Sequence, residues 1–167
     1  DEEVREYLPR SDNRDNLFRI MDRLARFDPV GGTRIAPVLH GMANQIRRKG
    51  IVIVISDFFD DEEELLEGIQ HLRFKGHDVI MMQVLDPFEI DFPFGGMVEF
   101  DGLEDIPLVR TRPSQIKKTY HHEFEAFRER LQLACERHQC HFVGLRTDQS
   151  LDEALANYLS FRKSTAG

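Results

Sequence analysis

Acidic and hydroxyl side chains gather where two apolar runs of the sequence, 51–55 and 79–85, come to an end. The residues concerned are Ser56, Asp57, Asp60, Asp61, Asp86 and Glu89. Ligands of parallel α/β sheets bind beyond the carboxyl ends of the strands, so we expect these side chains at one edge of a sheet. Carboxylate and hydroxyl oxygens are ligands that Mg²⁺ accepts, usually together with water. A weak metal site is one chemistry that this set could support.

The same acids also have a simpler structural interpretation. An aspartate at a strand end or in the first turn of a helix accepts hydrogen bonds from free backbone N–H groups and interacts favourably with the helix dipole. We therefore expect Asp60 or Asp61 to begin a helix, whereas Asp57 is open to both interpretations.

A third interpretation is an enzyme. A metal-dependent phosphohydrolase or nuclease holds two cations between carboxylates, and this chain offers candidates for that role in Asp57, Asp60, Asp61, Asp86 and Glu89. The sequence lacks a paired acidic motif on the first strand and a lysine with a clear role beside these acids. Hydrolysis is therefore the alternative function, and no catalytic residue is assigned.

Other reactive side chains do not form a recognisable site. The histidines and cysteines in question are His121, His122, Cys135, His138, Cys140 and His141. Cys140 and His141 are adjacent and point to opposite faces of a strand, while two neighbouring helical histidines diverge by about 100°, so zinc ligation is not expected. No Gly-x-Ser-x-Gly elbow and no phosphate-binding loop is present.

Apolar periodicity predicts the elements that position these residues. Spacing of three and four residues predicts helices that begin near 11–12, 33, 60–61, 113 and 150–152, and β-branched runs predict strands at 51–55, 79–85 and 141–145. The order of strand, helix and strand indicates a parallel sheet flanked by helices. We expect the strand 51–55 to be buried on both faces, and the stretch 4–8 to be extended.

Between the second and third strands the pattern changes. Two short apolar runs, 97–100 and 108–110, predict a small β-hairpin insertion within 91–111. Several phenylalanines lie in or beside it: Phe88, Phe92, Phe94 and Phe100. We expect them to pack within the insertion, because exposed apolar patches are rare on soluble domains.

Composition limits the class of protein. The 167 residues are 41% hydrophobic and 31% charged, which predicts one globular domain spanning 1–167. A net charge of -8 argues against a nucleic-acid partner, and the basic stretch 47–49 suits the end of a helix. Two cysteines are too few for a disulfide framework and indicate a cytoplasmic setting, and no apolar run could span a membrane in this segment.

Two segments together resemble a known family. They are Gly-Gly-Thr-Arg-Ile-Ala-Pro-Val-Leu at 31–39 and Gly-Ile-Val-Ile-Val-Ile-Ser-Asp-Phe at 50–58. Their order is similar to the middle of a von Willebrand factor A-type domain, and more narrowly to the bacterial DUF58 family. The segments 73–79, 85–89 and 147–155, with Tyr120 between the last two, extend the resemblance over nearly the whole chain.

The resemblance implies a partial doubly wound, mostly parallel sheet of the Rossmann type and a metal-ion-dependent adhesion site. Thr33 and Asp57 match two ligands of that site, but the family's Asp-x-Ser-x-Ser motif is absent. We therefore expect Thr33 and Asp57 to bind Mg²⁺ only in a complete domain, and no cofactor in this chain.

The missing motif also suggests that the domain is truncated at its N-terminus. In the strand order 3-2-1-4-5-6 the missing strands would lie beside 51–55, whose edge would then be unpaired. We expect such a chain to form a homodimer through that edge.

The function implied by the resemblance is non-enzymatic protein binding. The implied partner is a MoxR-type AAA+ ATPase, in complex assembly or chaperone-like activity. Asp86 and Glu89 would then lie at the rim of the partner-binding surface.

Overall fold

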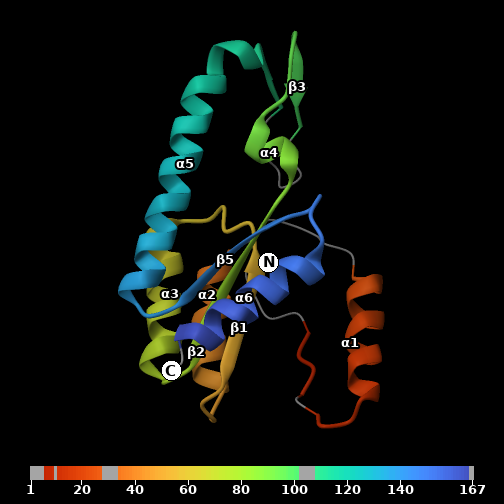
Figure 1. The fold of residues 1–167 in the computed structure, drawn as a ribbon, viewed down its shortest axis with the longest axis vertical. Coiled ribbons are helices and arrows are strands. Elements are labelled where there is room, and N and C mark those ends of the chain that lie inside the picture. Colours follow the sequence, from red (N-terminus) through yellow and green to blue (C-terminus); the bar gives the residue numbers. More distant parts are fainter. Residues whose placement is uncertain (1–5, 10, 28–33, 102–107, 166–167) are drawn as a thin grey trace.

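A three-stranded parallel sheet forms the centre of the computed structural model, which describes residues 6–9, 11–27, 34–101 and 108–165 (Figure 1). The strands are β1 (Ile51–Ser56), β2 (Asp78–Leu85) and β5 (His141–Arg146), in the order β1-β2-β5. In the register of the sheet, Val52 lies beside Val79 and Ile80 beside His141. The predicted α/β class and the unit of strand, helix and parallel strand are confirmed.

Helices cover the two faces of the sheet unequally (Figure 1). The helices α2 (Ile35–Gln45), α3 (Glu62–Phe74) and α5 (Pro113–Arg137) pack on one face, where their buried side chains join Val79 and Met81 of β2 in the main core. On the other face, Tyr158 of α6 (Leu151–Thr165) packs with Ile80 and Met82. Successive side chains of a strand point to opposite faces, so β2 is buried on both.

The strand β1 differs from our prediction. Ile51, Ile53 and Ile55 are 59%, 51% and 66% exposed, while Val52 is buried. The prediction that 51–55 is buried on both faces was wrong, because α6 packs on β2 and β5 and leaves this side of β1 uncovered. Among the described residues β1 pairs only with β2, so it is an edge strand.

The insertion after β2 contains the predicted hairpin and a short helix that we did not predict. The hairpin consists of β3 (Val98–Phe100) and β4 (Val109–Thr111), which pair in antiparallel fashion, and the helix is α4 (Pro87–Asp91). Phe92 stacks on Tyr120 of α5 and on Phe100, with ring centroids 4.3 and 5.9 Å apart. The expected packing of the phenylalanines within the insertion is confirmed, although Phe88 is exposed.

The first helix, α1 (Asp15–Arg26), has an apolar face but no buried residue. We predicted a helix that begins near 11–12, but α1 begins at Asp15, whose amide donates to the side chain of Asn13 at 3.0 Å. Residues 6–8 of the predicted extended stretch are not in a strand, and residues 4 and 5 lie outside the described residues. Within the described ranges, no helix is long and apolar enough to cross a membrane.

Phe58 follows β1 in a strained backbone conformation. Its φ is 63°, which is uncommon for a residue other than glycine, and its side chain is fully buried in the main core. Burial of the ring therefore stabilises a turn that the backbone alone disfavours.

We predict that Phe58→Ala lowers the free energy of unfolding by about 3 to 5 kcal/mol, the usual range for a buried phenylalanine. The matched control is Phe59→Ala, because Phe59 is half exposed, although its ring contacts those of Phe124 and Phe127. Urea titrations of both variants measure the difference. Equal losses would contradict the role assigned to Phe58.

Two buried thiols lie in the main core. Burial raises the pKa of Cys135 from 9.0 to about 12 and that of Cys140 to about 11. The Cys135 thiol donates to the sulfur of Met81 at 3.2 Å. Both thiols are therefore protonated in the folded chain at pH values where an unfolded chain would ionise them.

This difference predicts alkaline destabilisation. A raised pKa contributes stability that is complete below the unfolded value, about pH 9, and is lost as the pH rises towards 11 for Cys140 and 12 for Cys135. Urea unfolding measured between about pH 8 and 10.5 should show stability falling with pH. A Cys135→Ala, Cys140→Ala double variant, in which lysines and tyrosines still titrate, should show a flatter decline, and an equal slope would refute the prediction.

Candidate functional site

The carboxyl ends of the three parallel strands meet at one edge of the sheet. We call this the carboxyl edge and define it by Ser56 at the end of β1 with Asp57 after it, Asp86 after β2, and Arg146 at the end of β5 with Thr147 and Asp148 after it. In open parallel sheets this is the edge at which ligands bind. It brings together Asp57 and Asp86 from the predicted set and adds residues that we had not assigned.

At the end of β1, the polar groups hold a turn. The Phe58 amide donates to Ser56 Oγ at 3.0 Å, and the Phe59 amide donates to Asp57 Oδ1 at 3.1 Å. Ser56 Oγ itself lies 3.2 Å from the same carboxylate oxygen and donates to it. Asp57 is therefore exposed, but one of its oxygens is already engaged by two donors.

At the end of β2, Asp86 and Glu89 form a capping box for α4. Asp86 Oδ1 accepts from the Phe88 amide at 2.8 Å, and Glu89 Oε2 accepts from the Asp86 amide at 2.7 Å. The other Asp86 oxygen accepts from Thr147 Oγ1 at 3.1 Å. These bonds give Asp86 and Glu89 a structural role at the edge, while their role at a partner-binding rim stays a prediction.

At the end of β5, Arg146 joins two acids. Its guanidinium donates to both carboxylate oxygens of Asp148 at 3.0 Å and lies 3.5 Å from Asp91. The hydrogen bond from Arg146 lowers the pKa of Asp148, so this carboxylate stays ionised. We selected Asp57 and Asp86 because ligands of parallel sheets bind beyond the carboxyl ends of the strands. The same reasoning could have selected Arg146 and Asp148, because they lie at the end of the third predicted strand.

Beneath the carboxyl edge, a buried amide connects three elements. Gln83 of β2 is fully buried; its Nε2 donates to the Asp57 carbonyl at 3.0 Å, and its Oε1 accepts from Arg128 Nε at 3.3 Å. Gly144 lies beside Arg128, with no side chain to block it. The sequence does distinguish Gln83, as the single polar residue within the apolar run 79–85, but we assigned it no role.

Two other predicted acids serve the helices, and Asp61 does so at the predicted helix start. Asp61 caps α3 by accepting from the Glu64 amide at 2.9 Å. Asp60 Oδ2 accepts from the Ile35 amide at 2.6 Å and so connects the start of α2 to the start of α3. Because Asp60 and Asp61 are engaged in this way, they are poor candidates for the acidic cluster of a phosphohydrolase.

The described residues do not suit a metal. No group of three histidine, cysteine or carboxylate side chains among them could hold an ion, and this applies equally to the histidines and cysteines considered for zinc. Thr33, the second predicted ligand, lies outside the described residues. Asp57 thus offers one partly engaged carboxylate, which is too little for a site that binds Mg²⁺ tightly.

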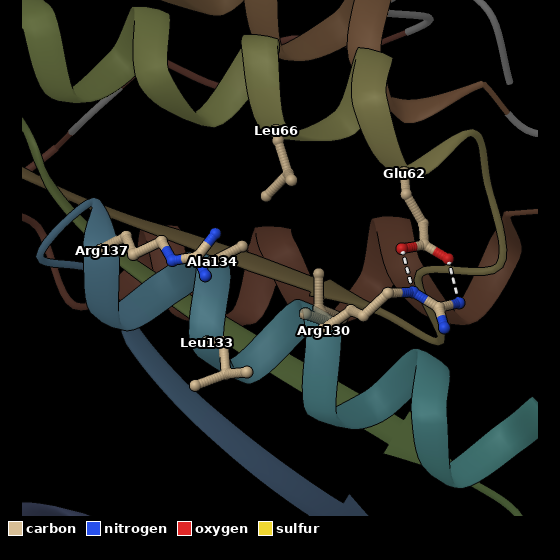
Figure 2. A pocket seen from close by; sticks show the side chains of 7 residues that line it. Glu62, Leu66, Arg130, Leu133, Ala134 and Arg137 are labelled. Carbon is tan, nitrogen blue, oxygen red and sulfur yellow. Dashed lines mark hydrogen bonds and ion pairs between the residues drawn. The ribbon is translucent and has the colours of Figure 1, made fainter.

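A depression of about 230 Å³ lies between α3 and α5, and Figure 2 shows its lining side chains. Its walls are mostly apolar, from Leu66, Leu131, Leu133 and Ala134. Glu62 and Arg130 close one end with two hydrogen bonds of 2.9 and 2.6 Å, which lower the pKa of Glu62. The depression contains no nucleophile and no general base with a raised pKa, so it is a crevice between helices without catalytic chemistry.

Comparison with known proteins gives one family. The family model described as "Protein of unknown function DUF58" matches residues 1–130, which include β1, β2, the insertion and most of α5. No curated protein matches the chain, and no solved structure matches it.

Replacing the buried amide tests how the carboxyl edge is held. We predict that Gln83→Met lowers the free energy of unfolding by about 1 to 3 kcal/mol, because it leaves the Asp57 carbonyl and Arg128 without their partner. Faster amide exchange at residues 57–59 should accompany the loss. The matched control is Gln132→Met on the exposed side of α5, and equal effects of the two changes would refute the assignment.

Proposed function

The chain belongs to the DUF58 family of unknown function, and on that premise we propose that it is a non-catalytic protein-binding domain of the von Willebrand factor A type. The proposed docking surface is the carboxyl edge. In keeping with the resemblance described above, the proposed partner is a MoxR-type AAA+ ATPase, in complex assembly or chaperone-like activity.

The observation that supports this proposal is the state of the polar groups at the carboxyl edge. Asp57, Asp86 and Asp148 each accept hydrogen bonds from within the chain, and the guanidinium of Arg146 is paired with Asp148 and Asp91. Such groups are fixed in position and charged, which favours recognition of a complementary surface. General acid–base catalysis would instead favour a carboxylate enclosed in a cleft, and Asp57, Asp86 and Asp148 are exposed.

The charge of the carboxyl edge indicates what the partner should offer. Asp57, Asp86 and Asp148 are exposed carboxylates of the edge, and its cation, Arg146, is paired with Asp148 and with Asp91 at the end of α4. A basic patch on the partner would complement this excess of acid. Thr33 and Asp57 stay our prediction for the metal ligands of a complete domain, whereas binding by this chain is proposed to be independent of metal.

Removing charge from the carboxyl edge tests the proposal. We predict that the double variant Asp57→Asn, Asp148→Asn weakens binding to a purified MoxR-type ATPase of the same organism at least about tenfold. Asparagine keeps an oxygen for the bonds that Asp57 Oδ1 accepts and for one of the two bonds from Arg146 to Asp148. Because Asp148 is exposed, loss of the other bond should leave the fold intact. The matched control, Glu67→Gln on the exposed face of α3, should leave the affinity unchanged.

The same preparation tests the metal and the alternative function. Calorimetry with MgCl₂ and the chain alone should show no tight binding. Absence of binding to the ATPase, or equal affinity of the edge variant and its control, would overturn the proposed surface. Hydrolysis of a phosphodiester with Mn²⁺ that is lost in Asp57→Ala would overturn the non-catalytic assignment and favour the phosphohydrolase.

A further inference from the structure

The end of the sheet opposite the carboxyl edge is the end at which β1, β2 and β5 begin, and we call it the amino edge. The helices α2, α3 and α5 each end shortly before one of these strands. The last turn of α6 lies here as well, because Arg162 pairs with Asp78 at the start of β2. The C-terminal ends of α2, α3, α5 and α6 therefore meet at the amino edge.

Exposed basic side chains occupy these helix ends and the turns that follow them. They are Arg47, Arg48, Lys49, Lys75, Arg137 and Lys163. The acids of the same segments, 46–50, 73–78, 136–140 and 162–163, are Asp78, which pairs with Arg162, and Glu136. The amino edge is therefore basic, although the chain as a whole carries a net charge of -8.

Contacts between neighbouring turns join these residues into one surface. The side chain of Lys49 lies over Gly76, where an added Cβ would be 2.7 Å from Lys49 Cε. Arg73 donates to the backbone carbonyls of His77 at 2.7 Å and His138 at 3.1 Å, which connects the turn after α3 to the end of α5. Because β2 lies between β1 and β5, the turn after α3 is in the middle of this surface.

The ring of Phe74, the last residue of α3, is 88% exposed in the middle of the basic surface. Cations at the C-terminal end of a helix interact favourably with its dipole, which accounts for basic residues alone. It does not account for an apolar ring among them. Proteins that lie on anionic membranes combine the two, because the cations meet the headgroups while the apolar side chain enters the boundary of the acyl chains.

The acids of the carboxyl edge are too far away to cancel this attraction. The strand β2 has eight residues, so the two edges are roughly 26 Å apart at about 3.3 Å per residue. The Debye length at physiological ionic strength is about 8 Å. An anionic surface beside the amino edge would therefore be attracted by the basic residues and hardly repelled by Asp57 or Asp86.

We propose that the amino edge binds the anionic surface of a lipid bilayer, with the ring of Phe74 inserted among the headgroups. A bilayer presents its phosphates in a plane, so it can meet the ends of several neighbouring turns at once. A nucleic acid also presents phosphates, but one exposed ring gives it little on which to stack its bases. The carboxyl edge would face away from the bilayer and stay open to a protein partner, although this proposal does not depend on that partner.

Vesicle binding tests the proposal. Co-sedimentation should show that the chain binds phosphatidylcholine vesicles containing about 30% phosphatidylglycerol, and binds phosphatidylcholine alone at least about tenfold more weakly. Binding should weaken as salt is added, because it depends on charge. Absence of binding, or equal binding to both kinds of vesicle, would overturn the proposal. Tighter binding to a double-stranded oligonucleotide at the same salt concentration would overturn it in favour of nucleic acid.

Charge reversal identifies the surface that binds. Lys75→Glu with Arg137→Glu should weaken binding to the anionic vesicles at least about tenfold, because both residues are exposed at the amino edge. The matched control is Arg110→Glu with Arg112→Glu, the same change of charge at exposed residues in and after β4, and it should leave the affinity unchanged. Circular dichroism verifies that both variants fold. Equal losses would show that net charge alone governs binding and would refute the assigned surface.

Fluorescence tests the insertion of the ring. The chain contains no tryptophan, so Phe74→Trp introduces a single fluorophore. Its emission should shift to shorter wavelength, and acrylamide should quench it less, when anionic vesicles are added, because the ring leaves water. The matched control is Phe88→Trp, at another exposed position, in α4 beyond the carboxyl edge, and its emission should not change. No shift in the first variant, or an equal shift in the control, would refute the insertion of Phe74.

Discussion

The carboxyl edge depends on one buried amide, that of Gln83. A polar side chain without access to water requires hydrogen-bond partners, and Gln83 finds them in the carbonyl of Asp57 and the guanidinium of Arg128. The amide thereby fixes the turn after β1 relative to β2 and α5. The exposed carboxylate of Asp57 owes its position to a group that no partner molecule could contact.

A second constraint is the burial of β2 on both faces. Val79 and Met81 pack against the helices α2, α3 and α5, whereas Ile80 and Met82 pack against α6. Because strand order places β2 between β1 and β5, any element that loosens β2 disturbs both neighbours. The acids and hydroxyls at the carboxyl edge therefore belong to one rigid framework, which suits a surface that recognises another protein without rearranging.

Local signals in the sequence were enough to predict the helices and strands of the core. The capping role of Asp61 and the long helix that begins at Pro113 follow from short-range chemistry, which a sequence displays directly. The burial of β1 could not be obtained in this way, because a β-branched run is equally compatible with a central strand and with an edge strand whose one face is bare. Strand order is decided by packing between distant segments.

The candidate site was predicted less completely for a related reason. Asp57 and Asp86 could be predicted because the expected binding edge of a parallel sheet depends only on where its strands end. Gln83 and Arg128 lie 45 residues apart in the sequence, and their contact exists only once α5 packs on the sheet. Glu89 also has a structural role that the sequence analysis did not assign, since its side chain caps α4.

Parallel strands give the sheet a direction, with every carboxyl end on the same side. The polar groups of the carboxyl edge therefore all face the same way. A partner that docks there would meet the ends of β1, β2 and β5 together, and no part of it would need to reach the opposite end of the sheet.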